Sequence, residues 1–236
     1  MRALLLAAGL GSRLNELTKS TPKCLMEVGG QTMLDHWLGK LDKLGVKEFL
    51  INTHYLADQV DAFISTHPLR DRINVSFEPT LLGTGMSFSS HLGWLKVGDC
   101  FVVHVDNYCE DSLEGMYDMF NNRSPSCDGT MLVFNTNRPR ECGIVEYDDD
   151  CMLTNFHEKV KHPPSSEASG AVFLFSASFL QKLDREAPIL HELSTDLIPM
   201  MIGRMNCYFT KQYFQDIGSP ETLEEANLWL SSCQSN

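Results

Sequence analysis

Short apolar runs alternate with segments of helical periodicity along most of the chain. The apolar runs that predict strands cover residues 4–7, 49–53, 73–77, 101–105 and 130–134. The segments whose apolar residues recur at helical spacing cover residues 34–44, 57–64, 87–95 and 113–121. Thr32 is suited to cap the first of these helices, and Gly45 is suited to end it. Such alternation predicts an α/β protein with a mostly parallel sheet between two layers of helices.

The pattern changes in the second half of the chain, where strands predominate. The strand-like runs lie at residues 144–147, 153–157, 171–175 and 207–210. A helix is predicted over 195–202, and a final helix begins with Ser219 as its cap and Pro220 at its first position. We therefore expect a small β-rich lobe beside the sheet, within a single domain that spans residues 1–236.

Charge, the lengths of apolar runs and the cysteine pattern restrict the expected partners and the expected compartment. The chain carries 31 acidic and 19 basic residues, whereas a protein that binds nucleic acid is expected to present a basic surface. The apolar run at residues 3–8 is too short for a signal peptide, and no stretch approaches the ~20 apolar residues of a membrane span. The eight cysteines show neither CxxC motifs nor metal-ligand spacing, which favours reduced thiols. We therefore expect a cytoplasmic protein without nucleic-acid or membrane partners.

A glycine-containing loop follows the first predicted strand. Gly9 and Gly11 come directly after that strand, and the cations Arg13 and Lys23 follow them. Glycine lets backbone N–H groups approach an anion closely, and the two cations can neutralise phosphate oxygens. The loop does not match G-x-G-x-x-G, because Leu14 takes the third glycine position, and it does not match the P-loop motif. The segment indicates phosphate binding, with an ordinary tight turn carrying solvated cations as the alternative.

Two aspartates follow apolar runs at other predicted strand ends. Asp106 comes directly after the 101–105 strand, and Asp216 follows a short apolar run before the last helix. Ligands of open α/β sheets bind beyond the carboxyl ends of the strands. Mg²⁺ prefers one or two carboxylates together with substrate phosphates. Both aspartates are therefore candidate Mg²⁺ ligands, and a turn or capping aspartate is the alternative at each position.

Together these segments resemble the signature of the sugar-1-phosphate nucleotidylyltransferases, or NDP-sugar pyrophosphorylases. The matching stretches are Leu6–Leu14 with Thr18 and Pro22-Lys23, Glu78–Gly85, Val105–Asn107, Glu158-Lys159 and Asp216–Glu221. The resemblance covers nearly the whole chain and is greatest to mannose- or heptose-1-phosphate guanylyltransferases. It implies a Rossmann-like catalytic domain, with nucleotide binding by about residues 1–125 and sugar-phosphate binding by about residues 126–236.

The resemblance also implies a role for each matching residue. It implies nucleotide binding by Leu6, Ala8, Gly9, Gly11, Ser12, Arg13, Lys23, Glu78, Gly83 and Thr84. It implies sugar-phosphate binding by Asn107, Gly143, Glu158, Lys159 and Ser169, and Mg²⁺ binding by Asp106 and Asp216. Arg13, Lys23 and the two aspartates would be the catalytic residues.

The implied reaction joins an NTP to a sugar 1-phosphate and releases pyrophosphate, as in NDP-sugar biosynthesis for capsule or other polysaccharides. GTP is favoured, because the Glu78 carboxylate suits a guanine edge and the Leu82–Gly85 stretch is common among guanylyltransferases. CTP and UTP stay open, as does a small non-sugar phosphate as acceptor. Val160 and Ser169 depart from the family pattern, which leaves the sugar open. The oligomeric state is open as well, a homo-oligomer included.

Three other classes of protein remain as alternatives. A glycosyltransferase that consumes NDP-sugars would use Asp106 and Asn107 for a metal but would not need the Gly9–Lys23 segment. A non-catalytic nucleotide-binding subunit is disfavoured by the presence of both cations and both aspartates. An oxidoreductase of the Rossmann type predicts a third loop glycine and a ribose-binding acid after the second strand, and Thr53-His54-Tyr55 offers neither.

Overall fold

The chain folds into two compact units, each assembled from segments that are distant in sequence. The structure is a computed structural model that describes residues 1–234. The glycine-loop unit comprises residues 3–81, residues 104–110 and the described chain from residue 213 onward. The hairpin unit comprises residues 1–2, 82–103 and 111–212. Residues far apart in sequence, such as Asp106 and Asp216, therefore belong to the same unit.

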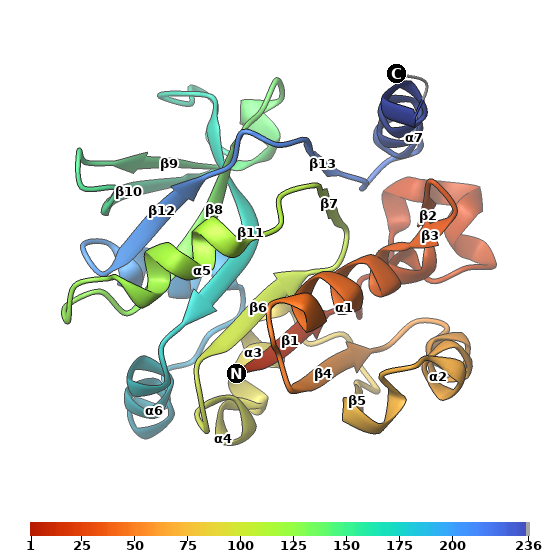
Figure 1. Ribbon diagram of the computed structural model, residues 1–236, viewed down its shortest axis with the longest axis horizontal. Helices are drawn as coiled ribbons and strands as arrows, with labels where there is room; N and C mark the ends of the chain where they lie inside the picture. The colour runs from red at the N-terminus through yellow and green to blue at the C-terminus, as the bar shows by residue number, and fades with distance from the viewer. Residues whose placement is uncertain (235–236) are drawn as a thin grey trace. The chain divides into compact units, whose positions relative to one another are not determined.

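The glycine-loop unit is built on parallel strands with helices beside them. Its strands β1 (Arg2–Leu6), β4 (Glu48–Thr53) and β5 (Ile73–Phe77) follow the order β1-β4-β5, and β4 pairs with β5 in parallel. Figure 1 shows the helices α1 (Met33–Lys43) and α2 (Ala57–Thr66) beside these strands. A short hairpin of β2 (Glu27–Val28) and β3 (Gln31–Thr32) precedes α1. Fully buried side chains of this unit include Leu4, Leu5, Trp37, Leu41, Phe49 and Ile51.

A second pair of strands in this unit brings the two candidate aspartates together: Asp106 directly precedes one strand, and Asp216 ends the other. Strand β7 (Asn107–Cys109) pairs antiparallel with β13 (Phe214–Asp216), and the last helix, α7 (Pro220–Gln234), follows β13. Helix α1 holds β7 from the side: Trp37 Nε1 donates to the Asn107 carbonyl oxygen, and His36 Nε2 donates to that of Cys109, each at 2.9 Å. The apolar face of α1 thus also fixes the backbone next to Asp106.

The hairpin unit is richer in antiparallel pairs. Its strands are β6 (Cys100–His104), β8 (Gly129–Asn135), β9 (Gly143–Tyr147), β10 (Leu153–Glu158), β11 (Glu167–Phe175) and β12 (Met205–Phe209). Strand β11 pairs antiparallel with β6, β8 and β9, β9 pairs antiparallel with β10, and β12 pairs in parallel with β8. Its helices are α3 (Thr84–Ser90), α4 (Leu92–Leu95), α5 (Glu114–Asn121) and α6 (Ala177–Glu186), and α5 contacts β8 and β12 (Figure 1).

The predicted α/β class is confirmed, with strands and helices alternating through the first half of the chain and a β-rich second half. Strand β5 has the predicted bounds. Helix α1 begins after Thr32, whose hydroxyl oxygen accepts the Asp35 N–H at 3.2 Å. The helix ends at Lys43 with Leu44 as its C-cap, and Gly45 follows with a left-handed φ of 84°. Within residues 1–234, no helix is both long and apolar enough to cross a bilayer.

Two predicted helices are interrupted, each for a local chemical reason. The helix predicted over 87–95 breaks at His91, whose ring Nδ1 donates to the Ser87 carbonyl oxygen at 2.7 Å and so competes with the helical bond. The helix predicted over 195–202 is a wide turn over Leu193–Leu197 and a 3₁₀ turn over Ile198–Met201. Pro199 has no N–H and cannot continue an α-helix.

Helix α6 was not predicted. Ser176 caps it by accepting the Phe179 N–H at 3.2 Å, and Phe179, Leu180 and Leu183 face the core. These apolar residues directly follow the apolar strand β11, so the change from strand to helix periodicity is hidden in the sequence. The serine at the cap position was the available signal.

The cap of α1 gives a test of the fold. We expect Thr32→Ala to lower the free energy of unfolding by about 1 kcal/mol, because the Asp35 N–H loses its acceptor. The measurement is urea denaturation. Thr66→Ala is the matched control, since the Thr66 hydroxyl only donates to the Phe63 carbonyl at the exposed end of α2. Equal destabilisation by the two substitutions would contradict the capping role.

Candidate functional site

The glycine loop leaves β1 and turns back on itself at Gly11. Gly11 has a left-handed φ of 63°, and a Cβ there would lie 2.6 Å from Cγ2 of Thr18. The Thr18 hydroxyl donates to the Gly11 carbonyl oxygen at 3.1 Å, and a 3₁₀ segment runs over Ser12–Lys19. At Gly9, by contrast, a Cβ would meet no atom within 4 Å, so the backbone there lies open. The loop is thus sterically constrained at Gly11 and open at Gly9.

Lys23 and Asp106 form a direct ion pair. Lys23 is only 8% exposed, and its Nζ donates a hydrogen bond to Oδ2 of Asp106. Burial opposes the charged form of Asp106, but the Lys23 ammonium and His104 outweigh it and hold the pKa of Asp106 below its usual value. Asp106 is therefore ionised, with a cation at its carboxylate.

Asp216 lies beside Asp106 because β13 pairs with β7. In that register Asp216 faces Asn107, and the Ile217 N–H donates to the Asp106 carbonyl oxygen at 3.0 Å. Burial and the charge of Asp106 raise the pKa of Asp216, although Lys23 and Arg13 act in the opposite direction. Both carboxylates therefore depend on the charge of Lys23 for the stability of their ionised forms.

Arg13 approaches the same pair of aspartates. Its Nη2 lies 3.8 Å from Oδ2 of Asp216, and the side chain is 65% exposed. Gly218 makes room for it, since a Cβ at that position would lie 2.8 Å from Arg13 Nη2 and equally close to Oδ1 of Asp216. A larger residue at 218 would displace the guanidinium, so the approach of Arg13 depends on this glycine.

The donor set suits a hard divalent cation. Oδ1 of Asp216 is buried without a hydrogen-bond partner, and the ionised carboxylate of Asp106 is its neighbour. Among residues 1–234, no group of three or more His, Cys, Asp or Glu side chains is arranged to hold a metal. Asp106 and Asp216 are the two carboxylates that could hold such a cation. Mg²⁺ is the cation that favours one or two carboxylates completed by phosphate oxygens and water, so the residues fit this ion.

A buried asparagine that was not predicted connects the glycine loop to Glu78. Asn52 is 2% exposed; its Oδ1 accepts the Ala7 N–H at 2.7 Å, and its Nδ2 donates to Oε1 of Glu78 at 2.8 Å. An unsatisfied amide would be costly at this depth, and here both of its ends are paired. The only sign of this role in the sequence is an asparagine within the apolar run 49–53.

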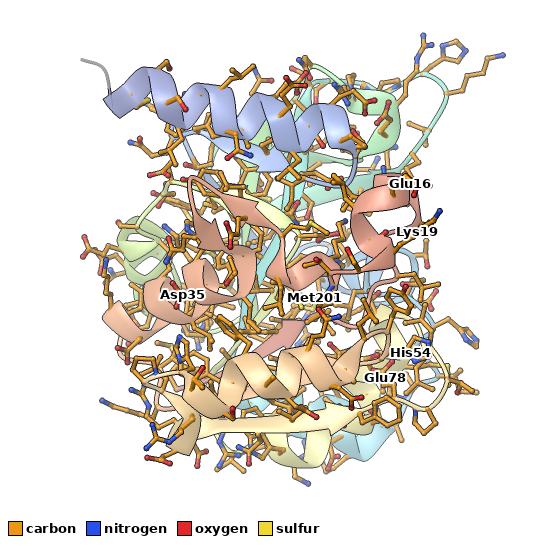
Figure 2. All side chains as sticks on the ribbon, turned by 90° about the vertical axis from the view of Figure 1, so that its right-hand side faces the viewer. Glu16, Lys19, Asp35, His54, Glu78 and Met201 are labelled. Atoms are coloured by element: carbon orange, nitrogen blue, oxygen red, sulfur yellow. The ribbon has the colours of Figure 1, made fainter. Side chains whose placement is uncertain are left out.

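The Glu78 side chain is itself buried, at 2% exposure. Its N–H donates to the Thr53 carbonyl oxygen at 2.8 Å, and its own carbonyl oxygen accepts from His54 Nδ1 at 2.7 Å. Figure 2 shows His54 and Glu78 next to each other. The carboxylate therefore holds the segment after β5 in place through Asn52.

In the hairpin unit, Gly143, Glu158 and Lys159 come together in the β9–β10 hairpin. The register places Glu158 opposite Gly143, and a Cβ at Gly143 would lie 2.8 Å from Oε2 of Glu158. Lys159 Nζ lies 3.1 Å from Oε1 of Glu158, and the Lys159 side chain is 64% exposed. Lys159 also has a left-handed φ of 47°, an uncommon conformation for a residue with a side chain. The hairpin thus packs the Glu158 carboxylate against the Gly143 backbone and presents the Lys159 ammonium to solvent.

Ser169 lies on β11, the strand next to this hairpin. The neighbouring residue Ala168 pairs with Ile144 of β9. The Ser169 hydroxyl oxygen accepts the Ala171 N–H at 3.2 Å, and Ala171 has a left-handed φ of 50°. Ser169 therefore stabilises an irregularity in β11 at the edge of the hairpin.

The predicted site residues thus form two sets. Those in the glycine-loop unit are Leu6, Ala8, Gly9, Gly11, Ser12, Arg13, Lys23, Glu78, Asp106, Asn107 and Asp216. Those in the hairpin unit are Gly83, Thr84, Gly143, Glu158, Lys159 and Ser169. The first set contains the cations Arg13 and Lys23 beside the two aspartates. The second set contains two glycines, two residues with hydroxyl groups and the ion pair of Glu158 with Lys159.

Comparison with known proteins identifies the family. The model of the family described as "Nucleotidyl transferase" matches residues 2–232. The chain therefore belongs to the nucleotidyl transferase family. The mannose-1-phosphate guanylyltransferase catalytic subunit beta of Drosophila pseudoobscura pseudoobscura is 27% identical over 240 residues, which cover 98% of this chain. The matched region makes up 63% of that relative, so this chain spans less than two thirds of its length.

Solved structures share the fold. A candidate glucose-1-phosphate thymidylyltransferase from Bacillus anthracis, solved with sucrose, superposes with a TM-score of 0.84 at 21% identity, covering 97% of this chain and 94% of that one. HddC from Yersinia pseudotuberculosis, solved with GMP-PN, superposes with a TM-score of 0.74 at 22% identity, covering 97% and 99%. At these identities the likeness shows the Rossmann-like α/β fold.

The geometry of Gly11 generates a stability test. We expect Gly11→Ala to lower the free energy of unfolding by about 2 kcal/mol, because the left-handed φ and the contact with Thr18 both oppose a Cβ. Gly9→Ala should change it by less than about 0.5 kcal/mol, since that position is open. Urea denaturation of both variants checks this; a Gly11→Ala protein as stable as Gly9→Ala would show that the turn is not constrained as described.

Proposed function

We propose that the protein is a nucleotidylyltransferase that condenses an NTP with a sugar 1-phosphate and releases pyrophosphate. The observation that carries the proposal is the gathering of Lys23, Asp106, Asp216 and Arg13 at one place in the glycine-loop unit. Family membership and the guanylyltransferase relatives support the same reaction.

The chemistry explains why such a site contains charges and no general base. A phosphate monoester is mostly dianionic near neutral pH, because its second pKa is about 6, so it is already a nucleophile. Its attack on the α-phosphorus of an NTP brings two anions together, and the main requirement is neutralisation of charge at fixed positions. Lys23 and Arg13 supply part of this positive charge, and a divalent cation held by the two carboxylates would supply the rest.

The cations and carboxylates take separate roles in this proposal. Arg13, whose side chain is largely exposed, binds the leaving pyrophosphate, and Lys23 lies against the triphosphate. Asp106 and Asp216 hold Mg²⁺, which supplies Lewis-acid neutralisation of phosphate oxygens when bound. Gly9 leaves its backbone open to an anion at the end of β1.

The hairpin unit supplies the groups for the sugar phosphate. Lys159 carries an exposed ammonium suited to a phosphate, and Glu158 carries a carboxylate suited to sugar hydroxyl groups. Gly143 lets the Phe156 ring and the Glu158 carboxylate pack against the hairpin backbone, because a Cβ there would collide with both. Ser169 of the same unit and Asn107 of the glycine-loop unit complete the predicted set.

GTP is the nucleotide favoured by the proposal. The named relatives include mannose-1-phosphate guanylyltransferases, and HddC was solved with a guanine nucleotide analogue. The Glu78 carboxylate is buried against Asn52, so backbone groups of the adjoining loops are the better candidates for contacts with the base. CTP or UTP with another sugar phosphate is the alternative within the same reaction class.

The reaction is tested by pyrophosphate release with Mg²⁺, GTP and mannose 1-phosphate. We expect Asp106→Asn and Asp216→Asn each to lower kcat by about 10²–10³-fold, because each removes a charge positioned for the transition state. Asp149→Asn, at an exposed position of the hairpin unit, should leave the rate unchanged. Unchanged activity in Asp106→Asn would contradict the assignment, and transfer from a ready-made NDP-sugar would indicate a glycosyltransferase instead.

Nucleotide and sugar preference are tested by a matrix of substrates. ATP, GTP, CTP, UTP and dTTP are each combined with hexose and heptose 1-phosphates, and kcat/KM is measured by pyrophosphate release. We expect the highest values with GTP. A maximum with another NTP would retain the reaction and overturn the base assignment.

A further inference from the structure

The loop of residues 83–85 is clamped by a second segment of the hairpin unit, residues 190–193. The Gly85 N–H donates to the carbonyl oxygen of His191 at 2.9 Å. A Cβ at Gly83 or at Gly85 would lie 2.8 Å from backbone atoms of that segment. The two stretches are therefore packed backbone against backbone, and the loop cannot shift unless the segment moves with it.

Glu192 makes the side-chain part of this clamp. Its Oε2 accepts the Thr84 N–H at 3.2 Å and the Thr84 hydroxyl at 2.5 Å, and the Leu193 N–H donates to Thr84 Oγ1 at 2.9 Å. Gly83 precedes α3 and has no side chain to cap it, so the Glu192 carboxylate satisfies the Thr84 N–H from a distant segment. The single proton of the Thr84 hydroxyl is directed to Glu192, which leaves none for a nucleotide.

Asp196 holds Glu192 in turn. Its Oδ2 accepts the His191 N–H at 2.6 Å and the Glu192 N–H at 3.0 Å. The Thr195 hydroxyl donates to Oδ1 at 3.1 Å. These backbone hydrogen bonds hold the pKa of Asp196 below its usual value, so the carboxylate is ionised where it orders the segment. Asp196 thus orients the backbone from which the Glu192 side chain reaches Thr84.

We propose that Glu192 is a positioning residue for nucleotide recognition: its carboxylate sets the geometry of the loop of residues 83–85 and thereby the affinity for the NTP. This proposal rests on the proposed function, which assigns Gly83 and Thr84 to the nucleotide. The Thr84 N–H, the Thr84 hydroxyl and the Gly85 N–H are all engaged by residues 190–193, so contacts with the nucleotide fall to the other backbone groups of the loop. Backbone contacts tolerate little displacement, because the atoms cannot reorient independently.

The proposal is tested on the full chain by calorimetric binding of GTP with Mg²⁺ and by steady-state kinetics. We expect Glu192→Ala to raise the Kd and KM for GTP about 10-fold, because hydrogen bonds to a charged group are lost. The KM for the sugar 1-phosphate and kcat should stay within about 3-fold of the wild type. Glu192→Gln should recover most of the affinity, since its amide oxygen can still accept both Thr84 donors.

Glu186→Ala is the matched control, because Glu186 is an exposed glutamate of the same unit whose carboxylate lies 3.8 Å from Lys182. It should leave the GTP affinity unchanged. If the Glu192→Ala protein binds GTP with the wild-type Kd, the proposal is overturned, even when the substitution lowers the melting temperature. An equal rise in KM for both substrates would overturn it as well, because the effect would then be general.

The two proposals fail in different ways. A wild-type protein that binds GTP, ATP, CTP or UTP but releases no pyrophosphate overturns the proposed reaction, and the ratio of Kd values between wild type and Glu192→Ala still decides on Glu192. A wild-type protein that binds none of these nucleotides overturns the role of Glu192.

Discussion

The ion pair between Lys23 and Asp106 is the interaction on which the glycine-loop site depends. A lysine that is 8% exposed requires a partner, because a buried and unpaired ammonium costs several kcal/mol. The direct contact also keeps Asp106 ionised in spite of its burial. Burial and that negative charge raise the pKa of the neighbouring Asp216, whose carboxylate lies next to the exposed Arg13. One partly buried pair therefore influences the charges of the other two groups.

Backbone geometry makes this concentration of charge possible. The pairing of β13 with β7 brings Asp216 next to Asp106 across more than a hundred residues of sequence, and Trp37 of α1 holds β7 from the other side. Glycines occur where a side chain would collide with the functional groups: Gly11 beside Thr18, and Gly218 beside Arg13. Close packing leaves little freedom at either position.

The hairpin unit also combines glycines with carboxylates, but fewer charged groups gather at each position. Gly143 faces the Glu158 carboxylate, and Lys159 adopts a left-handed conformation at the end of β10. Residues 83–85 are held by Glu192, whose own backbone is held by Asp196. In both places a carboxylate lies against a glycine, and at residues 83–85 it also accepts a backbone hydrogen bond.

The sequence by itself determined the alternation of strands and helices, the cap of α1 at Thr32, the glycine loop after the first strand with the cations that follow it, and the positions of Asp106 and Asp216 at strand ends. These follow from periodicity and from local chemistry, which act over a few residues. Only the tertiary structure decided the partners: Lys23 with Asp106, Asn52 with Glu78, and Glu192 with Thr84. Contacts over such separations depend on how strands pair and helices pack, and a single sequence carries no local signal of them.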